Sequence, residues 1–520
     1  MTRRIGIVGA GPGGLATAML LAKAGVDVTV HEARDCLGGR SSTITAPTPQ
    51  GTFRFDMGPT FFLYPRVLAD IFAACGRRLE DEVELIRLDP QYHLVFEGGG
   101  EMQATGDMER MAAEIARFSP ADAAALPRFM ADNRAKLAVF RPILEGAFNG
   151  MRDLVRPKVL RGLSKLRPHR SVDQDLGAYF RDPLVRLAFS FQSKYLGMSP
   201  FRCPSLFTIL SFMEYEYGVY HPRGGTGAVM AAMARVAREH GADIRLNEPV
   251  DEVLFEGRRA VGVRAGGVEQ RYDALVINAD FAQTMTKLVP DRIRRRWSDK
   301  RIAAKKFSCS TFMMYLGIEG ELADLSHHTV YLAGDYRRNL AEIEAGQAPG
   351  EPSFYVQNAC VTDPALAPPG HSTLYVLVPV GHRVGEGVDW VAEQARYRAL
   401  TLKRLERIGL HGIEKRIRFE KVLTPQGWEQ DLQVYRGATF NLAHSLGQML
   451  HFRPRNRFED LDGVYLVGGG THPGSGLPVI FESARITSRL LAEDLGVRPD
   501  WSAPSAMAKD HYEPAIAEAL

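Results

Sequence analysis

The first forty residues alternate between apolar runs and glycine-rich turns in the order strand, helix, strand. The apolar run at 5–8 predicts a short buried strand, the Ala- and Leu-rich stretch after residue 14 predicts a helix, and valines at alternate positions from 26 to 30 predict a second strand. Three glycines in the spacing G-x-G-x-x-G separate the first strand from the helix. The pattern predicts a βαβ unit that binds a dinucleotide.

Each glycine of this turn has a physical role. Gly9 permits the tight turn, Gly11 lets the backbone approach a pyrophosphate, and Gly14 allows the helix to pack closely on the strand. The helix N-terminus offers free N–H groups to that pyrophosphate. Glu32, at the end of the second strand, is placed to accept hydrogen bonds from a ribose diol. The residues expected at this site are Gly9, Gly11, Pro12, Gly13, Gly14, Glu32 and Ala33.

Farther along the chain, the pattern predicts blocks of helices and strands. The expected helices are 60–76, most of 107–195, 228–240 and 390–408, and the expected strands lie within 80–105 and at 242–246, 253–255, 274–279, 310–317, 353–358, 373–380, 416–423 and 464–467. The alternation of short strands with one long helix between 308 and 450 predicts a second, mixed sheet.

Composition places the chain among ordinary globular proteins. Of its 520 residues, 45% are hydrophobic and 24% charged, and a net charge of +3 argues against nucleic acid as a partner. The five cysteines are scattered without C-x-x-C spacing, which argues against disulfides or a metal site and favours the cytoplasm. No stretch approaches about 18 uninterrupted apolar residues, so membrane contact is expected only at the surface.

Two basic stretches are candidates for contact with a membrane surface. In 151–170, Lys and Arg residues interleave with leucines against a single acid, which is typical of interfacial amphipathic helices. A solvated lid helix, whose leucines pack on the domain below, is the open alternative. The second stretch, 292–306, has the composition of a solvated helix face, but Trp297 makes it a second candidate for a lipid headgroup contact.

The residues after Glu32 distinguish FAD from a nicotinamide cofactor. Gly38, Gly39 and Arg40 form a second glycine pair followed by a cation, for which a nicotinamide-binding unit has no particular use. FAD bound in an extended pose can use these residues, because its pyrophosphate and flavin continue past the first turn. The V-x-V-x-E-A-R-x-x-x-G-G-R pattern resembles the flavin amine oxidase and phytoene desaturase superfamily, so FAD is the expected cofactor.

A second glycine-rich junction lies near the C-terminus. Residues 463–485 read GVYLVGGGTHPGSGLPVIFESAR, which predicts a strand, a tight turn and a helix whose N-terminus again offers backbone donors. Together with Gln448, 452–454 and Asn456, this stretch resembles the C-terminal signature of the bacterial-type carotenoid (phytoene or diapophytoene) desaturase family. The resemblance continues through D-M-G-P at 56–59 and Y-H-P-R-G-G at 220–225, and covers nearly the whole chain.

The resemblance implies an α/β fold with a Rossmann-like FAD-binding domain, of the glutathione-reductase kind. A mixed-sheet substrate domain and a helical lid or membrane-contact region complete it. The implied FAD domain comprises 1–80, 216–290 and 451–497, the substrate domain comprises 81–215 and 291–450, and a loosely held tail covers 498–520. FAD is expected to contact Gly38, Gly39, Arg40, Gly58, Pro59, Val250, Gly469, Gly470 and Pro478 as well.

The implied activity is FAD-dependent desaturation of a long apolar isoprenoid, on the inner face of the cell membrane. Oxidised flavin accepts a hydride, the protein supplies orientation and a dry cavity, and a quinone or oxygen reoxidises the flavin. Residues 479–482 are bulkier than is common in enzymes acting on phytoene, which favours a thirty-carbon diapocarotenoid or an already modified carotenoid. A carotenoid isomerase or oxygenase and a non-catalytic flavoprotein are the alternatives.

No nucleophile, acid and base occur together at a recognisable spacing. His472 is the candidate acid or base because it lies in the expected flavin loop, and a structural histidine that fixes this loop is the alternative. Asp56 and Glu482 are weaker candidates, since Asp56 is suited to hold a turn and Glu482 to form a salt bridge or a cap.

Overall fold

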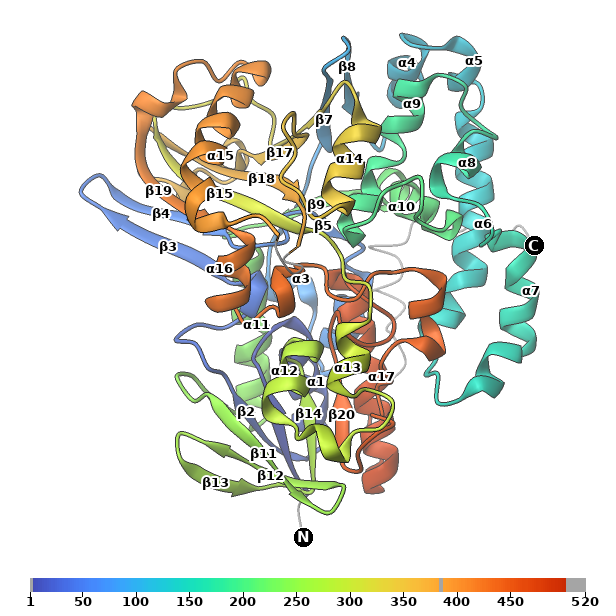
Figure 1. The fold of residues 1–520 in the computed structure, drawn as a ribbon, viewed down its shortest axis with the longest axis vertical. Coiled ribbons are helices and arrows are strands. Elements are labelled where there is room, and N and C mark those ends of the chain that lie inside the picture. Colours follow the sequence, from blue (N-terminus) through green and yellow to red (C-terminus); the bar gives the residue numbers. More distant parts are fainter. Residues whose placement is uncertain (1–2, 383–386, 502–520) are drawn as a thin grey trace.

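A parallel five-stranded sheet lies at the centre of the lower half of the molecule (Figure 1). The computed structural model describes residues 3–382 and 387–501, without the side chains of Lys158, Leu160, Arg161, Leu163 and Ser164. In spatial order the strands are β10 (Asp243–Arg245), β2 (Asp27–His31), β1 (Arg4–Val8), β14 (Ala274–Ile277) and β20 (Val464–Leu466), and all neighbours run parallel. Strands from the beginning, middle and end of the chain therefore form one sheet.

Three helices pack beside this sheet. α1 (Pro12–Lys23) contacts both α11 (Thr226–Glu239) and α17 (Leu477–Leu495), and every residue from Gly13 to Ala22 is buried. A helix enclosed on all sides needs no polar face, which explains its Ala- and Leu-rich sequence.

Smaller sheets connect the larger units. An antiparallel sheet of β11 (Val250–Glu256), β12 (Arg259–Ala265) and β13 (Val268–Arg271) lies at the bottom of Figure 1, and β3 (Thr43–Thr48) pairs with β4 (Gly51–Asp56). A third sheet has the order β5 (Phe62–Leu63), β9 (Val219–Pro222) and β6 (Leu85–Arg87). Further helices are α2 (Arg66–Ala74), α3 (Leu79–Glu82), α12 (Phe281–Leu288), α13 (Asp299–Ala303), α14 (Tyr336–Glu344) and α16 (Pro425–Gln430).

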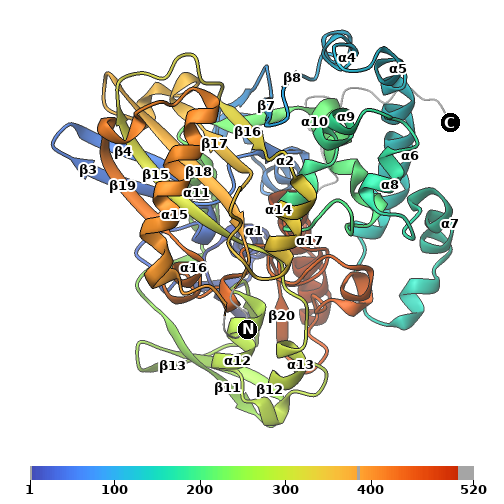
Figure 2. The same cartoon turned by 45° about the horizontal axis from the view of Figure 1, so that its top comes forward.

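The second large sheet is mixed and lies in the upper half of the molecule (Figures 1 and 2). Its order is β19 (Ile417–Leu423), β15 (Ser310–Glu319), β18 (His371–Val380), β17 (Phe354–Gln357), β16 (His328–Leu332), β7 (Tyr92–Phe96) and β8 (Glu101–Ala104), and only β16 and β7 among these described neighbours run parallel. On α15 (Trp390–Leu405), Trp390 and Tyr397 pack against Phe312. The predicted α/β fold with a mixed second sheet is confirmed.

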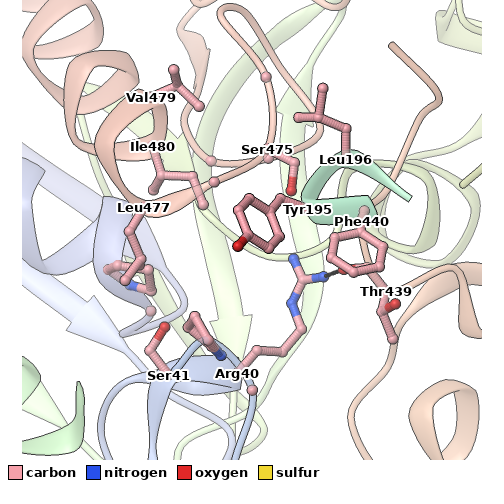
Figure 3. Close-up of a pocket in the computed structure, with 18 of the residues that line it drawn as sticks. Arg40, Ser41, Tyr195, Leu196, Thr439, Phe440, Ser475, Leu477, Val479 and Ile480 are labelled. Carbon is pink, nitrogen blue, oxygen red and sulfur yellow. Dashed lines mark hydrogen bonds between the residues drawn. The ribbon is translucent and has the colours of Figure 1, made fainter. Parts of the chain in front are cut away.

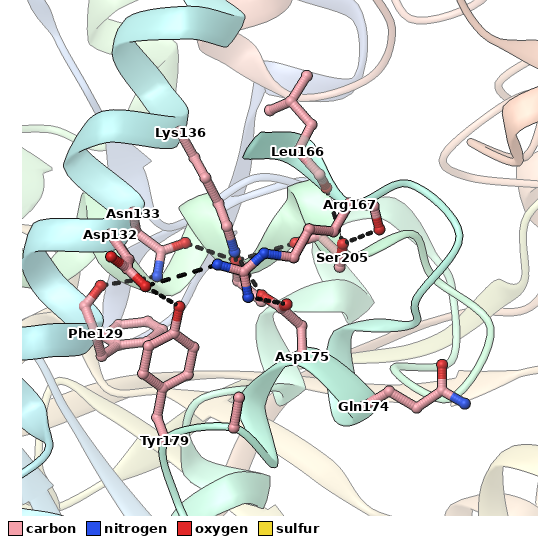
Figure 4. Close-up of polar contacts among 12 residues, drawn as sticks. Phe129, Asp132, Asn133, Lys136, Leu166, Arg167, Gln174, Asp175, Tyr179 and Ser205 are labelled. Carbon is pink, nitrogen blue, oxygen red and sulfur yellow. Dashed lines mark hydrogen bonds and ion pairs between the residues drawn. The ribbon is translucent and has the colours of Figure 1, made fainter. Parts of the chain in front are cut away.

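The segment between β8 and β9 forms a helical layer at one side of the molecule. Its α-helices are α4 (Met108–Ala116), α5 (Pro120–Ala123), α6 (Leu126–Leu144), α7 (Pro157–Leu166), α8 (Val172–Leu176), α9 (Pro183–Ala188) and α10 (Ile209–Tyr217). Lys136 of α6 and Asp175 of α8 form a buried ion pair, and Arg167 donates to the same carboxylate at 3.0 Å (Figure 4). The pair holds the two helices together because parting them leaves buried charges uncompensated. None of the helices in the described ranges is long and apolar enough to cross a membrane.

The predicted helix at 60–76 is wrong at its start. α2 begins only at Arg66, because Phe62 and Leu63 pair as β5 with Tyr220 and Val219 of β9. Pro65 also disfavours helical conformation in the residue before it. The apolar residues at 61–63 therefore belong to a strand and a loop, although their spacing also fits a helix.

The predicted headgroup contact of Trp297 is wrong as well. Trp297 is 1% exposed, its Nε1 donates to Glu459 Oε1 at 2.7 Å, and its ring packs edge-on against Phe281. The neighbouring Arg294 is buried and pairs with Asp299 at 2.6 Å. Asp299 belongs to the basic stretch itself, but Glu459 is distant in sequence, so the composition of the stretch does not reveal this second partner.

Candidate active site

One cavity of about 870 Å³ connects the parallel sheet with the helical layer. Its wall includes the turn after β1, the turn before α17, strands β16 to β18, and helices α6 and α10. Figure 3 shows Arg40, Tyr195 and Ile480, from three distant parts of the sequence, around the same space. Apolar side chains of the segment between β8 and β9 also line it, among them Leu137, Phe140, Phe191, Leu196, Phe207 and Leu210. Glycine-rich polar turns and apolar side chains thus line the same cavity.

At the polar end, Glu32 lies against the N-terminus of α1. Its Oε2 accepts a hydrogen bond from the Ala10 N–H at 2.7 Å and its Oε1 from the Arg34 N–H at 3.0 Å. These donors orient the carboxylate in the cavity wall, and each oxygen retains a lone pair for a further donor. α1 has Gly11 as N-cap and no side-chain cap, so its first N–H groups are free to bind an anion.

Most residues predicted to bind the cofactor line this cavity. They are Gly9, Gly11, Pro12, Glu32, Ala33, Gly39, Arg40, Gly58, Pro59, Val250, Gly469 and Pro478. Gly13, Gly14, Gly38 and Gly470 are not among the residues that line it. Close packing explains these glycines, because a Cβ at Gly14 would lie 2.2 Å from the Gly9 carbonyl oxygen and one at Gly470 would lie 2.6 Å from Phe281 Cβ.

Arg40 lies in the wall and has no carboxylate within ion-pair distance in the described part of the chain. Its guanidinium donates to the carbonyl oxygen of Thr439. Burial lowers the pKa of Arg40, and Asp280, which also lines the cavity, partly offsets this effect. A cation desolvated in this way is stabilised by an anion, so this end of the cavity fits the pyrophosphate of a dinucleotide.

The loop at 56–59 is fixed from two sides. Asp56 Oδ1 accepts hydrogen bonds from the backbone N–H and the hydroxyl of Thr226, at 2.7 and 2.9 Å. The hydroxyl of Tyr375 donates to the carbonyl oxygen of Gly58 at 2.6 Å. Asp56 therefore holds a turn, and Gly58 and Pro59 are held in the cavity wall.

His472 does not line the cavity. Its ring is 1% exposed and packs edge-on against Phe148, and its Nε2 lies 2.9 Å from the carbonyl oxygen of Gly146. Burial lowers the pKa of His472 to about 4. The following residues, Pro473 and Gly474, do line the cavity. The geometry supports the structural alternative, in which His472 ties the C-terminal loop to the helical layer. Glu482, in the wall, pairs with Arg485 at 2.8 Å.

No sequence motif identified the group of aromatic residues around Phe61 as part of the site. The Phe61 ring stacks on His328 with 4.1 Å between centroids, and lies 5.3 Å from Tyr355 and 5.4 Å from Tyr195. Phe61, Tyr195 and Tyr355 line the cavity. They come from separate segments with no shared motif, so only the fold brings them together.

Comparison with known proteins assigns the class. The family model described as flavin containing amine oxidoreductase matches residues 12–492, so the chain belongs to this family. Among solved structures, putrescine oxidase bound to putrescine has the same fold, with a TM-score of 0.63 at 18% identity over 95% of this chain and 99% of that one.

Carotenoid desaturases are similar over the whole chain. A 4,4'-diapophytoene desaturase (4,4'-diapolycopene-forming) of Methylomonas sp is 43% identical, covering 98% of this chain and 99% of the relative. An all-trans-zeta-carotene desaturase of Myxococcus xanthus is 40% identical, covering 96% and 94%. A lycopene-forming phytoene desaturase of Pseudescherichia vulneris is 36% identical, covering 94% and 99%. The resemblance seen in the sequence motifs is confirmed.

We predict that Gly14→Ala weakens both the fold and flavin binding. The new Cβ meets a backbone carbonyl, so α1 must move from β1, at a cost of about 1–3 kcal/mol in the free energy of unfolding. Gly98→Ala is the matched control, since nothing lies within 4 Å of its Cβ. Thermal unfolding and the FAD-to-protein absorbance ratio measure the two effects. Full stability and full FAD content in Gly14→Ala would contradict this account.

Proposed function

We propose that the protein is an FAD-dependent desaturase of a long apolar isoprenoid in carotenoid biosynthesis. The observation that carries the proposal is one cavity that is lined both by the glycine-rich turns of the dinucleotide-binding pattern and by an apolar wall. A substrate without a charged group is bound through its apolar area, which such a wall removes from water. The names of the relatives, all carotenoid desaturases, support the same substrate class.

FAD held in this cavity would supply the acceptor for the hydride that desaturation removes from carbon. Glu32 is proposed to bind its ribose, and the N-terminus of α1 and Arg40 its pyrophosphate. The flavin is proposed to lie against the predicted residues of the two later turns, which are Gly58, Pro59, Gly469 and Pro478. The apolar wall orients the polyene and excludes water, and a quinone or oxygen is the proposed final electron acceptor.

The domain boundaries follow from the same proposal. Residues 1–80, 216–290 and 451–497 each contribute strands to the parallel sheet, which supports one FAD domain assembled from three segments. Residues 81–215 and 291–450 contribute the helical layer and the mixed sheet, which supports a substrate domain built from two. Most of the predicted tail, from residue 502 on, lies outside the described residues.

A thirty-carbon substrate is proposed in preference to phytoene. Val479 and Ile480, at the start of α17, line the cavity (Figure 3). Branched side chains at these positions occupy space that glycine leaves open, so they limit the length or shape of the polyene. The 43% identity with a diapophytoene desaturase supports this choice.

Product analysis tests the reaction. In a carotenoid-free bacterial host that makes only diapophytoene, we expect pigments whose chromophore is longer and whose mass is lower by two hydrogens for each new double bond. The same host supplied with phytoene is the comparison and is expected to accumulate less coloured product. An isomer of unchanged mass, an oxygen-containing product or unchanged substrate would point instead to the isomerase, the oxygenase or the non-catalytic alternative.

A peripheral membrane contact is proposed where two short helices meet, η2 (Met151–Val155) and η12 (Leu450–Phe452). Met151 is 58% exposed, Val155 62% and Phe452 38%, although all three are apolar. Met449, next to η12, lines the cavity, so this surface, hereafter the apolar rim, lies beside one end of it.

Charge at the apolar rim favours an anionic bilayer. Arg152 is exposed on η2 itself, and Lys165 and Arg170 are exposed farther along the same basic stretch, whereas Arg156 and Arg167 are engaged with Asp153 and Asp175. The predicted basic helix thus contributes only part of its cations. Exposed apolar side chains flanked by free cations are typical of a surface that enters the lipid headgroup region.

The double variant Met151→Glu, Val155→Glu tests the apolar rim. Its binding to anionic phosphatidylglycerol vesicles, measured by cosedimentation, is expected to fall at least about tenfold, since burying one such side chain contributes about 1.5 kcal/mol or more. Val391→Glu is the matched control, because Val391 is 75% exposed on α15, in a separate part of the sequence. Equal binding by the double variant and the control would contradict the contact.

A further inference from the structure

Desaturation releases a proton, and a group inside the dry cavity must accept it. Two hydrogens leave adjacent carbons, one as a hydride and the other as a proton. Water, the usual acceptor, is excluded by the apolar wall, so a protein group within the wall has to accept it. Neither the sequence motifs nor His472 supplies such a group.

A hydroxyl group that is hydrogen-bonded to an imidazole lies beside the loop at 56–59. Tyr355 lines the cavity, and its hydroxyl lies 2.8 Å from Thr60 Oγ1, directly after Pro59. The same hydroxyl lies 2.7 Å from Nδ1 of His328. His328 is fully buried and stacked on Phe61, so its ring is fixed in this orientation.

We propose that Tyr355 and His328 form the proton acceptor of the desaturation, an inference that rests on the proposed function. The phenolic O–H donates to Nδ1 of His328, which is then the unprotonated nitrogen of a neutral imidazole. Tyr355 lines the cavity, so a substrate bound there can reach its phenolic oxygen. Tyr355 is therefore the catalytic residue that touches the substrate, and His328 acts through it.

The step balances without a further reactant. The substrate C–H bond breaks and its electron pair forms the second bond of the new alkene. The proton goes to the phenolic oxygen of Tyr355, while the phenolic proton passes to Nδ1 of His328, which becomes an imidazolium. The hydride from the adjacent carbon leaves with its own electron pair to FAD, as in the proposed function.

A weak base suffices for this step. Burial, with smaller contributions from His327 and His221, holds the pKa of His328 well below its usual range. The imidazole is therefore neutral and ready to accept a proton. A C–H bond next to a carbon that is losing hydride is strongly acidic, so the transfer is favourable despite the low basicity of the ring.

A row of buried histidine rings leads from His328 to a buried acid. The His327 ring lies 4.4 Å from that of His328, and the His221 ring lies 4.8 Å from that of His327. His221 Nε2 is 3.5 Å from Oδ2 of Asp363, a carboxylate that is 1% exposed. Asp363 is the acid that ends the row, and Arg223, 3.9 Å from it, is half exposed to solvent.

Glu214 is the competing acceptor. Burial raises the pKa of this carboxyl to about 7, close to the value that suits a base at neutral pH. Its Oε2, however, already accepts hydrogen bonds from Tyr92 and Gln192, each at 3.0 Å, and Glu214 does not line the cavity. The geometry therefore favours the Tyr355 and His328 pair.

Tyr355→Phe and His328→Asn test the pair in the FAD-loaded protein. Diapophytoene in phosphatidylglycerol liposomes is mixed anaerobically with each variant, and the rate of flavin reduction is followed in H₂O and in D₂O. Asn keeps a hydrogen-bond acceptor for Tyr355 but is not a base. We expect both variants to reduce flavin about 100-fold more slowly than the wild type, the lower range for loss of acid–base catalysis.

The solvent isotope effect separates chemistry from structure. The phenolic proton exchanges with D₂O, so the wild type is expected to show an effect that Tyr355→Phe loses. FAD content and polyene binding, measured by quenching of flavin fluorescence, are expected to stay unchanged. Tyr397→Phe, which removes a buried hydroxyl on α15 bonded to the Pro349 carbonyl, controls for simple loss of packing.

Three results would overturn the inference. These are a wild-type rate in Tyr355→Phe, a wild-type rate in His328→Asn, or loss of the isotope effect in Glu214→Gln while Tyr355→Phe retains it. Failure of the wild type itself to reduce its flavin would instead overturn the proposed function, so the two failures are distinguishable.

Discussion

The approach of the first helix to the first strand determines where the rest of the site lies. A Cβ at Gly14 would lie 2.2 Å from the Gly9 carbonyl oxygen, so only glycine permits this spacing. At that spacing the N-terminus of α1 opens into the cavity, and α11 and α17 both pack on α1. The middle and C-terminal segments thus reach the same cavity because they share one helix as a neighbour.

A second consequence is that one cavity contains both a polar surface for the cofactor and an apolar surface for the substrate. Charged groups at the glycine-lined end are oriented by the backbone, as Glu32 is by two N–H groups. Beside the loop at 56–59, the hydroxyl of Tyr375 donates to the Gly58 carbonyl and leaves mainly ring surface for a substrate. An unpaired polar group there would cost free energy on binding an apolar chain, which explains why this hydroxyl has a partner.

Patterns in the sequence predicted the features of the molecule that depend mainly on residues close together in the sequence. The parallel strands, the enclosed helix and the glycine turns follow from apolar runs and from positions where a side chain does not fit, and twelve predicted cofactor residues line the cavity. Trp297 and 60–64 were mispredicted because partners distant in sequence decide their burial and pairing. Tyr355 and His328 had no signal, since their proximity to Phe61 arises only from the mixed sheet.

Anaerobic reduction of the bound flavin by a polyene tests the central claim most directly. The purified, FAD-loaded protein is mixed with liposomes carrying diapophytoene, and separately with liposomes carrying phytoene, while the flavin absorbance is followed. The account predicts bleaching of the flavin together with a new visible chromophore, and more rapidly with diapophytoene. A flavin that dithionite reduces readily but that neither polyene bleaches would contradict it.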